Sequence, residues 1–261
     1  MRISSFFIPL FVLLAGLAGA LLRIEELSVV FDAVTGFPER NSTITLALVA
    51  LSIFVIFVVI IYAVIAAVKC NVASDFDNAF GTDSFIYPTI YIVGGIVWLG
   101  ATIVFFINLN VMSGIETLDV VFTVFSAMSA ISIMIFAVEV YKNPRRKLIS
   151  MLSLMPTLFT CFWLVLIYRD NASNPVLLDY AYACLAMIFA ALGFYFTSAF
   201  AFGKPAKIKP IVCYSAAIYF SFVKIVDDFP MSIKLIIGTI ILLNFFNLSA
   251  LLRNLQKKIK N

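Results

Sequence analysis

The chain alternates between long apolar segments and short polar ones along its whole length. Each apolar segment is near the roughly 20 residues that a helix needs to cross about 30 Å of hydrocarbon. Helices are expected because a backbone in lipid must satisfy its own hydrogen bonds. The pattern predicts eight membrane helices, of which the seventh is the shortest: Ser5–Leu22, Thr43–Val68, Ile86–Leu109, Leu118–Tyr141, Ile149–Tyr168, Leu178–Phe202, Ile211–Val226 and Met231–Leu252.

Composition supports the same class. Of the 261 residues, 63% are hydrophobic and 12% are charged. Soluble domains carry about 25% charged residues, so this chain is far outside their range. No segment is long and polar enough to form a soluble domain of its own. We therefore expect one membrane domain covering residues 1–261, an all-α polytopic membrane helix bundle.

Charge predicts the orientation of that bundle. If the N-terminus is cytoplasmic, 13 of the 18 Lys and Arg residues lie in inside segments, which follows the positive-inside rule. The five on the outer side are Arg23, Arg40, Arg169, Lys224 and Lys234. Both termini are then cytoplasmic. Membrane lipids, and a small solute or a membrane protein, are the expected partners. Nucleic acid is not, because no basic stripe with interleaved aromatic residues lies outside the apolar segments.

The first apolar segment also has features of a signal peptide, because Ala18-Gly19-Ala20 has the small-residue pattern of a cleavage site. Cleavage would leave seven helices. The apolar run is long for a signal peptide and the basic region before it is thin, which favours an uncleaved first helix.

The chemistry is limited by what the chain lacks. It contains no histidine, which excludes Ser-His proteolysis, HExxH zinc sites and haem ligation by histidine. The four cysteines Cys70, Cys161, Cys184 and Cys213 form no CxxC pair, and we interpret them as packing residues. No catalytic residue, cofactor or metal site is predicted.

The strongest candidates for binding lie on the predicted outer side. They are Asp32, Asp119, Arg169, Asp170 and Asp179. Asp119 and Asp179 begin predicted helices, where a carboxylate also favours the helix dipole, and this structural role is the leading alternative. For Arg169, in the polar stretch YRDNASNPVLLDY, an ion pair that ties its loop to the bundle is favoured over a ligand contact.

Other polar residues near the apolar segments have structural interpretations. Lys224 is expected to pair with Asp227 or Asp228 rather than to form a retinal Schiff base. Pro156 is expected to bend its helix and free a backbone carbonyl. The loop Asp75–Asp83 lacks the spacing of a calcium site, so it is expected to be solvated.

One helix carries a clear contact face. Small residues recur at three- and four-residue steps, which allows another helix to approach closely. They are Ala183, Ala186, Ala190, Gly193, Thr197 and Ala201.

Two stretches, Phe31–Pro38 (FDAVTGFP) and Phe162–Pro205, resemble a group of multipass membrane proteins of unknown function from anaerobic Gram-positive bacteria. The shared features include a Trp before Tyr-Arg, here Trp163, the Asn-Pro-Val-Leu run at Asn174–Leu177, and Phe-Ala-Phe-Gly at Phe200–Gly203. The resemblance implies a bacterial cytoplasmic membrane protein. It implies no activity.

Three functions remain open on these grounds. The leading hypothesis is a non-enzymatic module that binds a small solute, lipid or partner from the outer side, as a sensor or transport-associated protein. The second is a small-solute permease with a pathway near the fourth to sixth predicted helices. The third, a lipid-modifying enzyme that uses Arg169 and the outer carboxylates, is disfavoured by the short loops and the missing histidine.

Overall fold

The computed structural model describes residues 2–31, 37–39, 42–71, 76–81, 85–112, 116–142, 146–206 and 208–257. Eight long helices dominate them: α1 (Arg2–Glu25), α2 (Thr43–Lys69), α4 (Ile86–Met112), α5 (Thr117–Lys142), α6 (Arg146–Asp170), α7 (Leu177–Ala201), α8 (Lys209–Lys224) and α9 (Met231–Arg253). The smaller elements are the π-helix η1 (Glu26–Val30), helix α3 (Phe76–Phe80) and the antiparallel pair β1 (Cys70–Asn71) and β2 (Gln256–Lys257). The predicted all-α bundle is confirmed.

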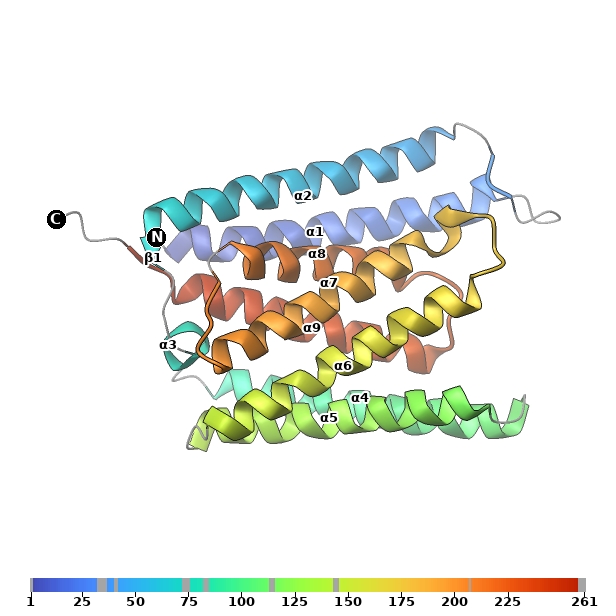
Figure 1. Ribbon diagram of the computed structural model, residues 1–261. Coiled ribbons are helices and arrows are strands. Elements are labelled where there is room, and N and C mark those ends of the chain that lie inside the picture. Colours follow the sequence, from blue (N-terminus) through green and yellow to red (C-terminus); the bar gives the residue numbers. More distant parts are fainter. Residues whose placement is uncertain are drawn as a thin grey trace.

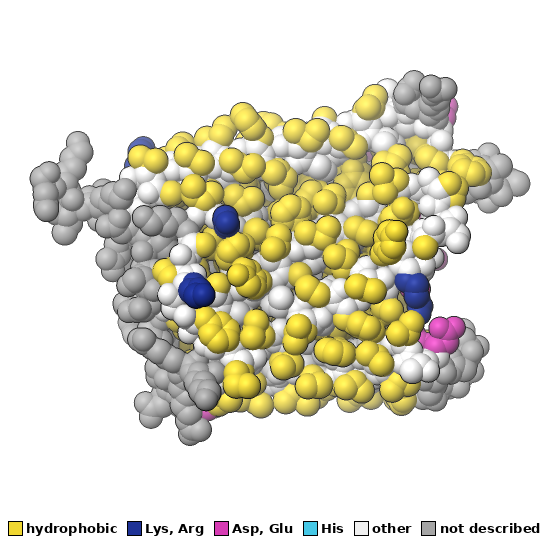
Figure 2. All heavy atoms as spheres, viewed as in Figure 1, with side chains coloured by type: hydrophobic (Ala, Val, Ile, Leu, Met, Phe, Trp, Pro, Cys, Tyr) yellow, Lys and Arg dark blue, Asp and Glu magenta, His cyan; other side chains and the backbone are white. Residues whose placement is uncertain are grey.

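Seven of these helices are long and apolar enough to cross a membrane. The exception is α8, the seventh predicted helix, whose 16 residues extend only about 24 Å. Large apolar side chains on the outside of the bundle are exposed. Figure 2 shows them across the middle of one face, and the few charged side chains on this face lie mainly toward its two ends. The chain is therefore a multipass integral membrane protein.

The helices alternate in direction, so α1 begins and α9 ends at the same end of the bundle, beside the two short strands (Figure 1). We call this the strand end. The opposite end, where α1 passes into η1 and α7 begins, is called the polar end.

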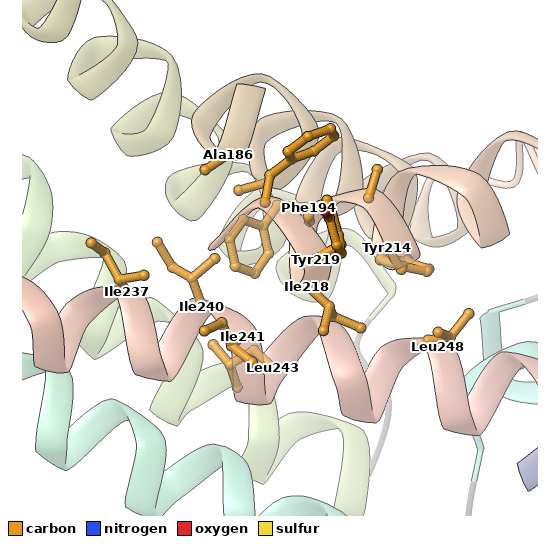
Figure 3. Packing of buried hydrophobic residues seen from close by; sticks show 14 of the residues in the cluster. Ala186, Phe194, Tyr214, Ile218, Tyr219, Ile237, Ile240, Ile241, Leu243 and Leu248 are labelled. Atoms are coloured by element: carbon orange, nitrogen blue, oxygen red, sulfur yellow. The ribbon is translucent and has the colours of Figure 1, made fainter. Parts of the chain in front are cut away.

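Helix α8 is the central element. It contacts α1, α2, α7 and α9, and 13 of its 16 residues are buried. A helix that is apolar on all sides belongs in an interior. Figure 3 shows the resulting core, in which side chains of α7, α8 and α9 point toward one another.

Close helix approach depends on small residues, as predicted for α7. A Cβ atom at Gly193 would lie 2.4 Å from Asn244 Oδ1 of α9 and 3.2 Å from the Tyr214 ring of α8, so a larger residue there would have to displace these side chains. The alanines of the same face are buried. Helix α1 meets α8 in the same way, because a Cβ at Gly16 would lie 2.7 Å from the Phe222 ring. The predicted contact face is confirmed.

Two local predictions were wrong. The first helix was expected to end at Leu22, yet helical backbone continues through η1 to Val30, because Arg23 and Glu26 are buried together rather than solvated. Within the loop that was expected to be solvated, Phe76–Phe80 forms α3. The Phe80 ring of α3 is fully buried against Phe200, with centroids 5.2 Å apart.

Candidate functional site

A cavity of about 750 Å³ lies at the polar end of the bundle. Its inner wall is apolar and includes Phe105 of α4, Phe122 of α5 and Trp163 of α6. Its charged lining comprises Asp119, Asp170, Asp179, Lys224, Asp227, Asp228 and Lys234. We call it the polar cavity. Ligand sites are commonly hollows of this size, with mostly apolar walls and a few placed polar groups.

Three of the predicted candidate residues converge on this cavity from three different helices. Asp119 lies in the first turn of α5, Asp170 ends α6, and Asp179 lies in the first turn of α7. Each carboxylate has a local hydrogen bond: Asp119 Oδ2 accepts from the Glu116 amide at 3.2 Å, and Asp179 Oδ2 accepts from Asn174 Nδ2 at 2.9 Å. These bonds fix the Asp119 and Asp179 carboxylates in the lining of the cavity.

Arg169 is placed differently from its prediction. Its side chain is 45% exposed, and its Nε and Nη2 donate to Oδ1 of the adjacent Asp170 at 2.8 and 2.6 Å. The pair lies within one helix end, so it does not tie the loop to the bundle as expected. The loop is held by two asparagines instead: Asn171 Nδ2 donates to the Ile167 carbonyl, and Asn174 Oδ1 accepts from the Val176 amide.

Asp32, the remaining candidate, lies outside the described residues. On either side of it, Phe31 and Pro38 form an antiparallel bridge, and the Glu39 amide donates to the Val30 carbonyl.

A buried arginine beside the cavity was not among the predicted site residues. Arg23 has no exposed side-chain area, although it sits in a helix that is long enough to span a membrane. Its Nη1 donates to Glu26 Oε2 at 2.8 Å and its Nε donates to Asp227 Oδ1 at 3.0 Å. The signal in the sequence was the i, i+3 spacing of Arg23 and Glu26, which pairs them only if the helix continues beyond Leu22.

Arg23 also positions the start of α7. Its Nη1 and Nη2 donate to the backbone carbonyls of Leu178 and Asp179, at 3.3 and 3.2 Å. The guanidinium therefore links α1, η1, the loop before α9 and α7. Because the Asp179 carboxylate lines the polar cavity, Arg23 acts on the cavity through the backbone that carries this residue.

Lys224 and Asp227 form the buried part of the charged lining. As predicted, they pair, with Lys224 Nζ 3.8 Å from Asp227 Oδ2 and 3.5 Å from the centroid of the Phe229 ring. Lys224 is the last residue of α8, beyond the seven spanning helices. Burial lowers its pKa to about 8, against the attraction of Asp227. Burial likewise raises the pKa of Asp227, against the attraction of Arg23 and Lys224.

A second, apolar hollow of about 510 Å³ opens between α2 and α7. It is lined by side chains such as Ile53 and Phe57 of α2 and Leu185 of α7. Ser52 also lines it, and its hydroxyl lies 2.9 Å from the hydroxyl of Tyr219. Its lining suits an acyl chain and contains no charged side chain, so it offers less to select a solute than the polar cavity does.

The chemistry of the polar cavity is that of fixed carboxylates and ammonium groups beside aromatic rings. Among the described residues, no three acidic or cysteine side chains are grouped closely enough to hold a metal ion. The predicted bacterial family and its membrane remain predictions. No protein-family model, no curated protein and no solved structure matches the chain.

Proposed function

We propose that the protein is a non-enzymatic membrane module that binds a small organic cation in the polar cavity, as a sensor or a transport-associated protein. The observation that carries the proposal is the convergence of Asp119, Asp170 and Asp179 from three helices on one cavity. When separate helices supply the binding residues, ligand affinity depends on how those helices are arranged, and binding can favour one arrangement over another. A sensor or a carrier requires this coupling.

The charge of the lining supports a cation. Five aspartates and two lysines line the cavity, so its lining carries a net charge of −3 when all seven are ionised. The aromatic wall supports the same class of solute, because the faces of Trp163 and Phe122 attract cations and quaternary ammonium groups. A ligand with an ammonium group and an apolar body satisfies both parts of the lining.

We place the polar cavity on the outer face of a bacterial cytoplasmic membrane. The support is the distribution of basic residues, since the inside segments hold 13 of the 18. The bacterial setting rests on the resemblance of the two stretches Phe31–Pro38 and Phe162–Pro205. In this orientation the cavity meets solutes from outside the cell.

Binding is tested with phenyltrimethylammonium, which combines a permanent positive charge with an aromatic ring. Isothermal titration calorimetry on the full-length protein in detergent should show saturable binding. Asp119→Asn and Asp179→Asn should each weaken it by about fivefold, or about 1 kcal/mol for the loss of one partly exposed charge.

Two controls separate a site from general attraction. Benzenesulfonate has the same ring with the opposite charge and should not bind. Glu25→Gln removes an exposed acidic group from the polar end that does not line the cavity, and should leave the affinity unchanged. Equal losses in Glu25→Gln and Asp179→Asn would contradict the proposed site.

A further inference from the structure

The face of α4 that lines the polar cavity continues along the whole bundle. Phe105 lines the polar cavity, Tyr91 lines a small void inside the bundle, and Tyr87 lines a cavity at the strand end. Trp98 lies between Phe105 and Tyr91. Successive members of this series are seven, seven and four residues apart, which places all four on one helix face. Three separate hollows therefore follow one line through the protein.

The middle hollow, which we call the inner void, is small, and a few polar side chains interrupt its mainly apolar lining. Its volume is about 20 Å³, and its lining includes Tyr91, Ser153 and Asn247. A void of this size with several polar partners has room for one water molecule. Pro156 and Leu152 also line it, and because proline has no N–H, the Leu152 carbonyl lacks its usual partner in α6. Its polar groups on Tyr91, Thr197 and Asn247 are hydrogen-bonded to one another beside this space.

An aromatic layer closes the line between the polar cavity and the inner void. Phe122 and Trp163 form the wall of the polar cavity, and the Phe159 ring lies behind them, with centroids 5.2 and 5.5 Å away. Trp98 packs against Phe159 at 5.4 Å. Trp98 and Phe159 are fully buried, so the layer is sealed in this structure.

A polar layer closes the line between the inner void and the cavity at the strand end, whose volume is about 180 Å³. The hydroxyls of Tyr87 and Tyr91 both donate to Asn247 Oδ1. Asn247 Nδ2 donates to Thr197 Oγ1 at 3.3 Å, which lies 2.8 Å from the Tyr214 hydroxyl. These five buried side chains come from α4, α9, α7 and α8, so their hydrogen bonds join four helices at this depth.

We propose that the polar cavity, the inner void and the strand-end cavity form one translocation path, with the aromatic layer and the polar layer as its two gates. This inference rests on the proposed function, because the solute enters from the polar cavity. The path offers aromatic faces and acceptor oxygens in turn, first at Trp163 and Phe159, then at Asn247 and the Leu152 carbonyl. Both kinds of group stabilise a cation that has left water. Opening the gates in turn moves the cation across without a continuous pore.

The path is tested by solute exchange in lipid vesicles that contain the full-length protein. Vesicles preloaded with unlabelled phenyltrimethylammonium are diluted into the radiolabelled compound. Because a quaternary ammonium ion cannot lose its charge, it has no neutral form that could cross the lipid. We expect the label to accumulate inside faster than in protein-free vesicles. Asn247→Leu removes the centre of the polar layer and should slow exchange by about tenfold or more, the effect of unpairing several buried groups.

Binding separates this inference from the proposed function. Asn247 lies far from the polar cavity, so Asn247→Leu should change the affinity measured by calorimetry by less than about twofold. Thr239→Val is the matched control, because Thr239 is a buried polar residue of the same helix that lines none of the three hollows. Wild-type protein that binds the cation without exchanging it would overturn the path and leave the binding site standing. Protein that does not bind it would overturn the proposed function.

A second measurement does not depend on how well Asn247→Leu folds. Ser153→Cys is introduced into a chain whose four cysteines are replaced by alanine. Its thiol should react with a water-soluble methanethiosulfonate reagent, and phenyltrimethylammonium should slow the reaction, since the path admits water and the cation to the inner void. If the Ser153→Cys variant exchanges the cation as the wild type does and its thiol stays unreactive, the solute travels by another route.

Discussion

Arg23 and Arg169 lie at the same end of the bundle, yet they differ in almost every physical respect. Arg169 is 45% exposed and pairs with its neighbour in sequence. Arg23 has no exposed side-chain area and bonds to a residue 204 positions away. Both run against the predicted positive-inside orientation in the same way. The contrast shows that this bias identifies which arginines need an explanation, whereas burial decides which one holds the fold together.

The energetics of the two pairs follow from their surroundings. Around Arg169, water competes for both charges and the pair contributes little to stability. Around Arg23, removing the guanidinium leaves Glu26 buried without its cation and Asp227 with Lys224 alone, and an uncompensated buried charge is strongly destabilising. Substitutions at the two positions therefore test the contrast directly.

Arg23→Met should produce the largest effect. We expect a loss of about 3–5 kcal/mol in the free energy of unfolding, because Glu26 loses its cation and Asp227 loses the nearer of its two. The matched variant Arg169→Met should leave the midpoint of thermal unfolding within about 2 °C of the wild type. Tryptophan fluorescence during thermal unfolding in detergent measures both. Equal losses at the two positions would remove the distinction between them.

A double substitution tests the cause of that loss. If the orphaned charge is responsible, Arg23→Met combined with Glu26→Leu should regain about 1–3 kcal/mol relative to Arg23→Met alone. The corresponding pair, Arg169→Met with Asp170→Asn, should show no coupling beyond error, because solvent already screens it. Unfolding midpoints of the singles and doubles give both couplings. A double variant less stable than Arg23→Met would mean that Glu26 stabilises the polar end without Arg23.

The sequence predicted the membrane helices well and the contacts at the polar end only in part. Apolar runs define membrane helices because the thickness of the bilayer sets their length. The lysine at the end of α8 was correctly paired with Asp227, since three residues on a helix end bring them together. Contacts such as that of Arg23 with Asp227 depend on which helix ends lie next to one another. The residue pattern of a single helix contains no information about its neighbours.

The same limit explains why the polar cavity itself could not be predicted from the sequence. Asp119, Asp170 and Asp179 were predicted as candidate binding residues of the outer side, with a helix-end role as the alternative for Asp119 and Asp179. The packing of α5, α6 and α7 shows that all three line one hollow. For Arg169, the sequence suggested a link across the loop, but a carboxylate one residue away was the nearer partner. The solvated-loop prediction failed at Phe80 for a related reason, because its burial depends on Phe200 of α7.

The pH dependence of binding extends the contrast to a third cation, Lys224. Its pKa is about 8, so its ammonium group loses its proton as the pH rises through that value. The lining then becomes more negative, and phenyltrimethylammonium, whose own charge is fixed, should bind more tightly. The gain should be about tenfold at most, one charge acting over roughly 12 Å at an effective dielectric constant of about 20. Calorimetry at pH values on both sides of the pKa measures it.

The control for this effect is Lys224→Met. It removes the titrating group, so the affinity should be high at both pH values and should no longer depend on pH. A variant that keeps the full dependence would assign the titration to another group. Arg23, which stays ionised throughout this range, contributes no pH dependence of its own.

The smallest expected effect lies at Arg169 and concerns binding rather than stability. Arg169→Gln leaves Asp170 without its neighbouring cation at the opening of the cavity, so the affinity for phenyltrimethylammonium should rise by about twofold at low ionic strength. Because the pair is exposed, the gain should vanish as salt screens it over about 8 Å at physiological ionic strength. Calorimetry at low and physiological salt distinguishes the two possible roles of this residue. A loss of affinity that persists at high salt would instead mean that the guanidinium contacts the solute directly, and Arg169 would then belong to the binding site as Asp170 does.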